Sequence, residues 1–298
     1  MPPGVLAIVL NWNSADDCFA CLASLARTTY AHRVLVVDNG SSDDSVARLR
    51  AHSPPLEILE LGVNRGYAAG NNRGIAWGLA RGFDYFWILN PDVTVGPACL
   101  AGLVHVAEAQ PRAAMVGPLV YCKESPQRLL SAGGVFRDGW TWHRGLGELD
   151  VGQFTGVTEV DYLTGCAVLI PRALVESIGA LDERFFLYEE DVEWCYRARH
   201  AGLRVLLAPH AKVWHPDTRR RDDLSARVTY YTARNKLLLL RTHRLGARAV
   251  AVHLLRHART LASWTLRPKW RHKRAQRRAL LRALLDAARA RWGAADGL

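Results

Sequence analysis

Four apolar runs of the sequence each end in side chains that carry an amide or a carboxylate. The runs at 5–10, 34–37, 56–61 and 85–89 are followed by Asn11 and Asn13, Asp38 and Asn39, Asn64 and Arg65, and Asn90 and Asp92. Asn and Asp also form turns readily, so any one of these sites by itself indicates a turn. All four together favour a ligand site, because ligands of open α/β sheets bind beyond the carboxyl ends of the strands.

The sequence argues against a dinucleotide or a P-loop nucleotide as that ligand. NWNSADD follows the first apolar run, where a G-x-G-x-x-G motif would stand, and G-x-x-x-x-G-K-[ST] does not occur. A second candidate for chemistry is the run Glu189, Glu190 and Asp191 at the start of a predicted helix. Acids commonly cap helices, but three in succession exceed that need and favour a functional carboxylate.

The elements that must position these residues alternate between strand and helix. After the four strands named above, strands are predicted at 115–121, 129–136, 161–170 and 205–208. One helix is predicted to begin at Ser14, and a second to end at about residue 52. Two more are predicted over 66–81 and 96–110, and a last one is predicted to end at Gly202. This alternation predicts a mostly parallel sheet with helices on its faces. The continuous apolar runs VLAIVL, VLVV and YFWIL suit strands that are buried on both faces.

Charge is divided unevenly along the 298 residues. The segment 218–298 holds 21 of the 39 Lys and Arg residues but only 4 of the 28 Asp and Glu residues. Its net charge is +17, and the net charge of 1–217 is −6. The contrast predicts an acidic-leaning body at 1–217 and a basic extension at 218–298 with a different task.

The six cysteines are scattered, and only Cys18 and Cys21 form a C-x-x-C pair, within a predicted helix. Buried reduced thiols are therefore favoured over a zinc or redox site. Residues 1–10 lack the basic region of a signal peptide, and no apolar stretch is long enough to span a bilayer. We expect a protein of the reducing cytoplasm.

An ordered set of motifs covers roughly residues 4–241. It comprises VLNWNS, VLVVDNGSSDDS, NRGYAAGNNRGI, ILNPDV, TGCAVLIPRALVESIGALDERFFLYEEDVEWCYRARHAG, VWH and YYTARNKLLLL. With these motifs the chain resembles family 2 glycosyltransferases of the GT-A fold, in particular the bacterial rhamnosyltransferase-like branch. The resemblance implies a Rossmann-like catalytic domain at 1–217, with a nucleotide-sugar half at about 1–113 and an acceptor half at about 114–217.

The resemblance also implies roles for individual residues. Contacts to the nucleotide sugar would come from Asn11, Asn13, Asp38, Asn39, Asn64, Arg65, Gly66, Asn72 and Asn90. Asp92, the last residue of a D-x-D motif that here reads Asn90-Pro91-Asp92, would bind Mg²⁺ or Mn²⁺. His215 matches a position that often completes the metal site, although it could equally end a strand and bond a carbonyl group. Asp191, preceded by Glu190, matches the catalytic base.

The sequence signals for residues that contact the acceptor are less specific. The resemblance implies an acceptor contact at Gly165, and Trp140 and Trp142 could line an acceptor groove, although Trp is also a common core residue. Arg234 and Asn235 match the family within YYTARNKLLLL, but the sequence assigns them no role.

The chemistry is consistent with these roles. One carboxylate together with substrate phosphate and water can hold Mg²⁺, and the cation acts as a Lewis acid and template. A carboxylate within hydrogen-bond reach of the acceptor hydroxyl can remove its proton. The Gln-x-x-Arg-Trp motif of processive members is missing. We therefore expect inverting transfer of a single sugar, rhamnose by similarity, to a lipid-linked or cell-surface glycan precursor.

Residues 224–292 show helical patterns in which leucines face one side and basic residues the other. Three partners fit such helices: an anionic membrane surface, the body of the protein, and nucleic acid. Nucleic acid ranks last because no RNP-like or zinc-finger pattern occurs. The membrane ranks first, which predicts a peripheral protein on the inner face of the plasma membrane; the oligomeric state stays open.

Two other functions share some of these features. A sugar nucleotidyltransferase should carry a Gly-rich loop with Arg and Lys after the first strand, and NWNSADD offers no cation. A non-catalytic module that only binds a nucleotide sugar would not need both Asp92 and Asp191. Both remain alternatives to the transferase.

Overall fold

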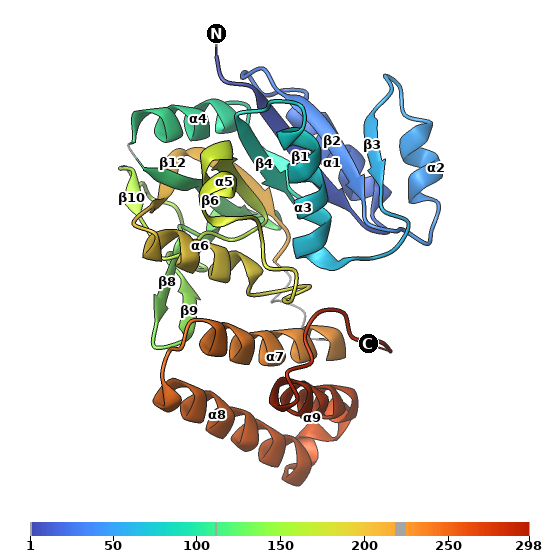
Figure 1. Cartoon of the computed structure of the whole chain (residues 1–298), viewed down its shortest axis with the longest axis vertical. Coiled ribbons are helices and arrows are strands. Elements are labelled where there is room, and N and C mark those ends of the chain that lie inside the picture. The colour runs from blue at the N-terminus through green and yellow to red at the C-terminus, as the bar shows by residue number, and fades with distance from the viewer. Residues whose placement is uncertain (1, 111, 218–224, 298) are drawn as a thin grey trace.

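The computed structural model describes residues 2–110, 112–217 and 225–297. A domain built on one large sheet comes first, and the helices of the basic extension form a separate layer beneath it (Figure 1). The strands are β1 (Val5–Asn11), β2 (Arg33–Asp38), β3 (Glu57–Glu60), β4 (Tyr85–Leu89), β5 (Thr94–Val95), β6 (Ala113–Cys122), β7 (Ser125–Ser131), β8 (Gly134–Arg137), β9 (Trp140–His143), β10 (Thr158–Glu159), β11 (Ala167–Pro171) and β12 (Arg204–His215). The helices are α1 (Ala15–Leu25), α2 (Ser45–Arg50), α3 (Gly66–Leu79), α4 (Cys99–Ala109), α5 (Arg172–Ile178), α6 (Glu190–His200), α7 (Ala226–Thr242), α8 (Ala247–Leu266), the short 3-10 helix η2 (Pro268–Lys273) and α9 (Arg274–Ala288).

The predicted mostly parallel sheet is confirmed. Its strand order is β10-β12-β6-β11-β4-β1-β2-β3, with β5 beside β12 and β7 beside β6. The strands β3, β2, β1 and β4 are parallel, whereas β11 runs antiparallel between β4 and β6. The chain moves outward from β1 to β3 and then returns to the other side of β1. The carboxyl ends of β1 and β4 therefore flank the switch point at which such sheets bind ligands.

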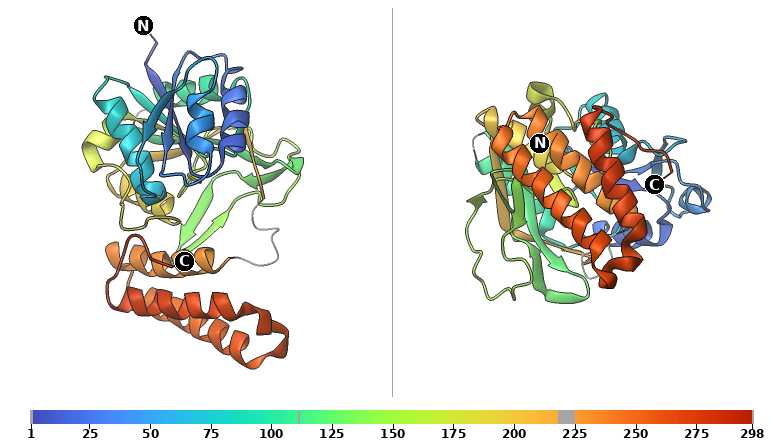
Figure 2. Two further views of the ribbon diagram at one scale, coloured as in Figure 1. Left: turned by 90° about the vertical axis from the view of Figure 1, so that its right-hand side faces the viewer. Right: turned by 90° about the horizontal axis from the view of Figure 1, so that it is seen from below.

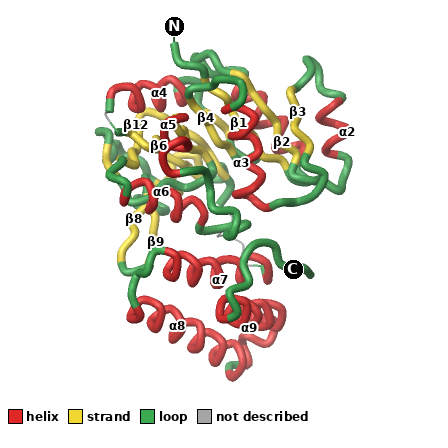
Figure 3. Tube along the Cα trace, in the orientation of Figure 1, coloured by secondary structure: helices red, strands yellow, loops and turns green. Residues whose placement is uncertain are grey.

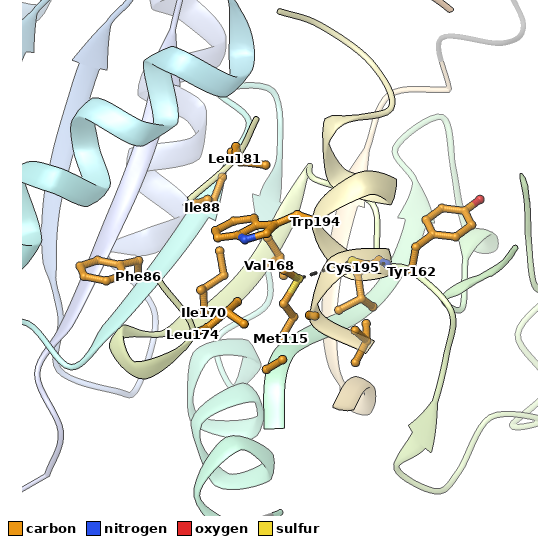
Figure 4. Close-up of a cluster of buried hydrophobic side chains, with 14 of the residues drawn as sticks. Phe86, Ile88, Met115, Tyr162, Val168, Ile170, Leu174, Leu181, Trp194 and Cys195 are labelled. Atoms are coloured by element: carbon orange, nitrogen blue, oxygen red, sulfur yellow. Dashed lines mark hydrogen bonds between the residues drawn. The ribbon is translucent and has the colours of Figure 1, made fainter. Parts of the chain in front are cut away.

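Helices cover both faces of the sheet, as Figure 3 shows. Alternate residues of β1 divide between two cores: Leu6 and Ile8 pack with α3 and α6, and Ala7 and Val9 pack with α1 and α4. The buried Trp194 and Cys195 attach α6 to the sheet, where the Cys195 thiol lies 3.4 Å from the sulfur of Met115 (Figure 4). All six cysteines are buried and free, which agrees with the predicted reduced thiols.

The single strand predicted at 129–136 is wrong, because the chain turns within it. Gly133 adopts φ +78°, a left-handed conformation that strand residues with a Cβ avoid. The residues before it pair with β6, and those after it form the separate β8–β9 hairpin. The turn releases this hairpin from the large sheet.

The strand predicted at 161–170 is shorter than expected, and the strand predicted at 205–208 is longer. Asp161 and Tyr162 bond to the start of β8, so only Ala167–Pro171 joins the large sheet as β11. In β12 the register shifts between Ala208 and Lys212, where Pro209 interrupts the ladder. The strand resumes beyond this irregularity and carries the predicted VWH motif to His215.

The predicted helical nature of the extension is confirmed, while residues 218–224 at its start lie outside the described residues. The helix α7 packs against the body and α9 packs against α7, so the alternative of packed helices applies to them. Figure 2 shows the β8–β9 hairpin reaching from the sheet domain to these helices. Among the described residues, no helix combines the length and the apolar character that crossing a bilayer requires.

Candidate functional site

Asp38 at the end of β2 organises the first group of predicted ligand residues. Its Oδ1 atom accepts hydrogen bonds from the backbone N–H groups of Gly40 and Ser41, at 3.1 and 2.9 Å. Its Oδ2 atom accepts from Asn11 Nδ2 at 2.9 Å and from Ser41 Oγ at 2.6 Å. Asn13 joins the group through its N–H group, which donates to Ser41 Oγ at 2.9 Å. The structure thus brings together three of the predicted nucleotide-binding residues from β1 and β2.

The loop after β3 is fixed against the same strand end. Asn39 Nδ2 donates to Asn64 Oδ1 at 3.3 Å and to the carbonyl group of Gly66 at 3.1 Å, and Asn39 Oδ1 accepts from the Arg65 N–H group at 2.9 Å. Gly66 has φ +83°, and a Cβ there would lie 2.4 Å from the Phe186 carbonyl oxygen. The glycine is therefore required for the approach of the 183–190 segment, and the Arg65 side chain stays exposed.

Asn72 does not join this group. Its Nδ2 atom donates to the Leu181 carbonyl at 2.9 Å and to Glu183 Oε1 at 3.1 Å, and its Oδ1 atom accepts from the Leu181 N–H group at 3.0 Å. Both ends of the amide are thus occupied by the chain that leads into α6. The position corrects our prediction of a nucleotide contact: Asn72 anchors that segment to α3.

The D-x-D-like motif and the end of β12 meet, although 125 positions separate Asn90 from His215. The Nε2 atom of His215 lies 3.2 Å from Asp92 Oδ1 and 3.4 Å from Asn90 Nδ2. His215 Nδ1 lies 2.8 Å from the Pro216 carbonyl oxygen, so Nδ1 carries a proton and Nε2 either carries the second proton toward Asp92 or, in the neutral ring, offers its lone pair to a cation. His215 therefore ends a strand and bonds a carbonyl group, and it also faces Asp92. Its role as a metal ligand stays a prediction.

The electrostatics of this pair suit a cation. Burial alone raises the pKa of Asp92, but the His215 imidazole outweighs it and holds the pKa below its usual value. Burial lowers the pKa of His215, and the Asp92 carboxylate raises it to above its usual value. Asp92 Oδ1 is buried and has no donor in hydrogen-bonding geometry. An unsatisfied carboxylate oxygen beside an imidazole nitrogen is a donor set that a divalent metal fits.

No larger set of His, Cys, Asp and Glu side chains suited to a metal occurs within residues 2–110, 112–217 and 225–297. Asp92 and His215 would therefore supply two ligands and leave the other positions to water and substrate. One carboxylate together with substrate phosphate and water is the usual arrangement for Mg²⁺ beside a diphosphate, and the imidazole would be an additional nitrogen ligand.

A pocket of about 370 Å³ lies next to this pair. Its lining includes Asn90 and His215 together with the acids Glu189, Glu190 and Asp191. Asp191 Oδ2 accepts from the Gly165 N–H group at 2.9 Å, and Asp191 Oδ1 accepts from the Val192 N–H group at 2.8 Å. The predicted acceptor residue Gly165 thus lines the pocket and also positions the carboxylate.

Glu190 and Asp191 differ in how their charges are stabilised. Burial raises the pKa of Asp191, and the N–H groups of Gly165 and Val192 oppose the rise. Burial, followed by the charge of Asp191, raises the pKa of Glu190 far more, and Glu190 Oε2 has no hydrogen-bond partner. The geometry therefore assigns the proton to Glu190 and the negative charge to Asp191. An ionised carboxylate held in a pocket can act as a general base.

The backbone that presents these acids is strained. Phe186, Tyr188 and Glu189 have φ values of 64°, 70° and 72°, a region that residues with a Cβ rarely occupy. Each such residue costs about 1–3 kcal/mol and persists only when its surroundings hold it. Strain of this kind next to the two acids marks a constrained functional segment.

The helix α7 holds this segment, which sequence reasoning did not anticipate. Asn235 Nδ2 lies 2.7, 2.7 and 2.8 Å from the carbonyl oxygens of Phe185, Leu187 and Tyr188. Lys236 Nζ donates to Glu189 Oε2 at 2.6 Å. Burial raises the pKa of Glu189 above its usual value, and the Lys236 charge limits that rise. The motif YYTARNKLLLL was the only signal in the sequence, and it carried no information about the partner.

Tyr67 is a further residue that the sequence did not single out. Its N–H group donates to the Phe186 carbonyl at 2.6 Å, and its hydroxyl donates to the Gly165 carbonyl at 2.5 Å. Because Gly165 donates to Asp191, Tyr67 links the loop after β3 to the acids at the start of α6. The nucleotide-side cluster and the pocket are thus parts of one hydrogen-bonded site.

Trp140 and Trp142 do not line this pocket. Their neighbours Thr141 and His143 do, because successive side chains of β9 point to opposite faces. Trp140 instead stacks on His253 of α8 with ring centroids 4.4 Å apart, and Trp142 is exposed. Neither indole lines the catalytic pocket, and the predicted acceptor groove at these two residues stays a prediction.

Comparison with curated proteins places the chain among glycosyltransferases. Residues 2–232 match the model of a family described as Glycosyltransferase like family 2. The N-acetylglucosaminyl-diphospho-decaprenol L-rhamnosyltransferase of Mycobacterium tuberculosis is 32% identical over 218 residues, which cover 65% of this chain and 70% of that protein. The galactofuranosyltransferase GlfT1 of the same organism is 31% identical over 227 residues, covering 72% and 71%.

Solved structures show the same architecture. A mannosyltransferase of Pyrobaculum calidifontis, solved with GDP-Man and Mn²⁺, has a TM-score of 0.58 at 16% identity and covers 97% of this chain and 88% of that one. GalNAc-T7, solved with UDP, GalNAc and Mn²⁺, has a TM-score of 0.65 at 15% identity and covers 80% of this chain and 48% of that one. The chain therefore belongs to glycosyltransferase-like family 2 and is a glycosyltransferase with the GT-A fold.

Proposed function

We propose that the protein transfers a single sugar, with inversion, from a nucleotide-diphosphate sugar to an acceptor hydroxyl group. The observation that carries the proposal is the pocket that Asp191 lines together with Asn90 and His215, whose Nε2 atom lies 3.2 Å from Asp92 Oδ1. A base for the acceptor and a cation site for the leaving diphosphate are the two requirements of a single displacement.

The nucleotide part of the donor would bind at the cluster around Asp38 and Asn39, with Asn11, Asn13, Asn64, Arg65 and Gly66 shaping the same strand edge. Asp92 and His215 would hold Mg²⁺ or Mn²⁺. When bound, such a cation supplies Lewis-acid stabilisation of the leaving diphosphate. Asn90, 3.4 Å from His215 Nε2, keeps the imidazole oriented.

Asp191 would accept the proton of the attacking hydroxyl. Its two backbone donors hold the carboxylate in one orientation, and the protonated Glu190 avoids a second charge beside it. Lys236 supports this charge distribution through Glu189.

The acceptor is proposed to be a lipid-linked glycan precursor and the donor sugar to be rhamnose. The relative from Mycobacterium tuberculosis is named for rhamnosyl transfer to N-acetylglucosaminyl-diphospho-decaprenol. We further propose that the basic extension binds the anionic inner face of the plasma membrane. Aliphatic side chains are exposed among its basic residues, at Val252, Leu254, Leu255 and Leu266 on α8 and at Leu281 and Leu285 on α9.

A donor screen tests the proposal. UDP-, GDP- and dTDP-sugars are each added to the protein with Mn²⁺, with Mg²⁺ and with EDTA, and the melting temperature is recorded. We expect one nucleotide class to raise Tm only when a metal is present, since a ligand at 100 times its Kd adds about 2.7 kcal/mol of stability. If no donor raises Tm in any metal, the transferase assignment of this site is wrong. Release of pyrophosphate from a nucleoside triphosphate and a sugar phosphate would indicate the nucleotidyltransferase instead.

Asn235→Ala should lower both stability and kcat. The carbonyl groups of Leu187 and Tyr188 lose the Asn235 donor, whereas the Phe185 carbonyl keeps the Leu187 N–H group. Each unsatisfied buried group costs about 1–3 kcal/mol. A shift of about 1 Å in a catalytic group can cost about 10²-fold in rate, so we expect kcat to fall by about that factor. Thermal melts and initial rates at saturating donor measure the two effects.

Tyr230→Phe is the matched control for Asn235→Ala. It removes a buried hydrogen bond of 2.7 Å from Tyr230 on α7 to Asp286 on α9 and, among the described residues, no hydrogen bond to the segment 185–190. We expect a lower Tm with kcat within about threefold of wild type, a small effect on the scale of transition-state free energies. An equal fall of kcat in both variants would mean that α7 acts only through general stability.

Lys236→Met should move the acid limb of the pH–kcat profile to higher pH. Asp191 works as a base only when ionised, and its pKa is already raised by burial. The Lys236 charge lowers that pKa, so its removal raises the pKa further and the rate is lost at a higher pH as pH falls. The rate at alkaline pH should recover.

Lys212→Met is the charge-matched control for Lys236→Met. Lys212 is on β12, its Nζ atom lies 3.6 Å from Asp150 Oδ2, and it does not line the catalytic pocket. Its profile should overlay that of wild type. An acid limb that stays in place in Lys236→Met would show that Asp191 is not the titrating group.

A further inference from the structure

A second groove, of about 470 Å³, lies between the tip of the β8–β9 hairpin and the outer helices. Its walls include Trp140 of β9, Trp264 of α8 and Trp270 of η2, with Leu255, Arg256 and Arg259 of α8. It shares no lining residue with the catalytic pocket. Nothing in the mechanism proposed above uses it.

The lining of the groove combines two chemistries. Three indole rings and an exposed leucine offer an apolar surface, and two guanidinium groups offer positive charge. No carboxylate lines the groove, and within the described residues neither Arg256 nor Arg259 has an acidic side chain within ion-pair distance. A ligand that fits must therefore carry an apolar chain and an anionic group.

The two arginines are spaced for phosphate. Residues 256 and 259 are three positions apart on α8, so their side chains leave the same face of the helix. The guanidinium of Arg256 lies over the Trp140 ring at 4.7 Å, which fixes its plane against the wall. Guanidinium groups bind phosphate oxygens in a bidentate manner, and two of them side by side match a diphosphate.

The groove and the catalytic pocket lie on opposite sides of one short strand. Trp140 lines the groove, and the next residue, Thr141, lines the pocket. Their Cα atoms are about 3.8 Å apart. Among the described residues β9 pairs only with β8, so no strand covers its other edge; Lys236 Nζ of α7 lies 3.4 Å from Thr141 Oγ1.

We propose that this groove binds the prenyl diphosphate part of a lipid-linked acceptor while its sugar lies in the catalytic pocket. The inference rests on the proposed transferase function and adds the site of the carrier. The indoles and Leu255 contact the isoprenoid units next to the diphosphate, and Arg256 and Arg259 bind the diphosphate itself. His253, buried behind Trp140, stacks on it and braces this wall.

The test measures binding of farnesyl diphosphate to the full chain by isothermal titration calorimetry without any membrane. Two double variants are compared: Arg256→Gln with Arg259→Gln, and Arg248→Gln with Arg278→Gln. Both lose two positive charges from exposed sites on the extension, but only the first pair lines the groove. We expect the first pair to raise Kd at least tenfold and the second to change it less than threefold.

The ligand controls separate the diphosphate from other sources of affinity. Farnesol should bind at least tenfold more weakly than farnesyl diphosphate; equal binding of the two overturns the inference. An equal loss in both double variants overturns it as well, because the effect would then be general electrostatics. If the groove pair weakens binding to phosphatidylglycerol vesicles but not to farnesyl diphosphate, the groove is a membrane contact and the inference is wrong.

A separate readout tests the underlying transferase function. Wild-type protein is incubated with the donor found by the screen, and nucleotide release is followed without acceptor. Donor turnover without binding of farnesyl diphosphate refutes the carrier groove alone. Binding in the groove with neither turnover nor stabilisation by any donor refutes the transferase function, and with it the assignment of the groove to an acceptor.

Discussion

Asp191→Asn is expected to lower kcat by about 10²–10⁴-fold, the range that general-base groups contribute. The amide cannot take a proton from the acceptor hydroxyl. The backbone N–H groups of Gly165 and Val192 now donate to the two carboxylate oxygens. In the variant, the NH₂ group of the amide would face one of these donors and lose that hydrogen bond. Donor binding should persist, because the residues proposed to hold the nucleotide lie on β1, β2 and the loop after β3.

Initial rates at saturating acceptor and a donor-binding isotherm measure the two consequences of Asp191→Asn. Glu190→Gln is the matched control: burial and the Asp191 charge raise the pKa of Glu190 well above its usual value, so the amide resembles the protonated acid that this shift favours. We expect that control to lose less than about tenfold, which is 1.4 kcal/mol. Activity of Asp191→Asn within tenfold of wild type would falsify its role as base.

Asp92→Asn should abolish the metal-dependent part of donor affinity and lower kcat by about 10³-fold. The variant removes the carboxylate charge and leaves one oxygen beside His215 in place of two. A metal's Lewis-acid contribution of several kcal/mol corresponds to about three powers of ten in rate. Without the carboxylate, His215 also loses the partner that raises its pKa, so that pKa should fall.

Donor titrations with Mn²⁺, with Mg²⁺ and with EDTA measure this loss. Asp84→Asn is the matched control, because Asp84 precedes β4 just as Asp92 follows it, and its carboxylate accepts from the Gly4 N–H group at 2.7 Å at the opposite edge of the sheet. The control should keep the full difference in donor affinity between the titrations with metal and the titration with EDTA. If Asp92→Asn keeps it too, the cation binds elsewhere.

Much of the fold was predictable because it depends on local patterns. The strand at Tyr85–Leu89 was predicted to the residue, since a continuous apolar run ends there at a proline turn. The strand at 129–136 was wrong because one glycine conformation divides it, and periodicity does not report φ. The strand at 161–170 was wrong because its two halves bond to different sheets, which only the tertiary structure decides.

The candidate site divides in the same way. Asp38, Asp92 and Asp191 follow from strand ends and a helix start, and the structure places them at one edge of the sheet domain. The sequence could not distinguish Asn72 from the residues predicted to contact the nucleotide. The residue type of a helical amide does not show whether it bonds a ligand or, as here, a backbone carbonyl 109 positions away. The sequence did not show that Thr141 and His143 rather than Trp140 and Trp142 would line the catalytic pocket, because side chains of a hairpin alternate and either face could meet the pocket.

The sequence by itself determined the chemistry of this protein: which acids and amides stand at strand ends, and where positive charge accumulates. These features depend on residue type and on neighbours a few positions away. Only the tertiary structure decided which of them act together. Asn235 bonds to Phe185 across 50 positions and holds a strained segment that local preferences disfavour. Because such contacts follow from the packing of whole elements, no periodicity or motif spacing records them.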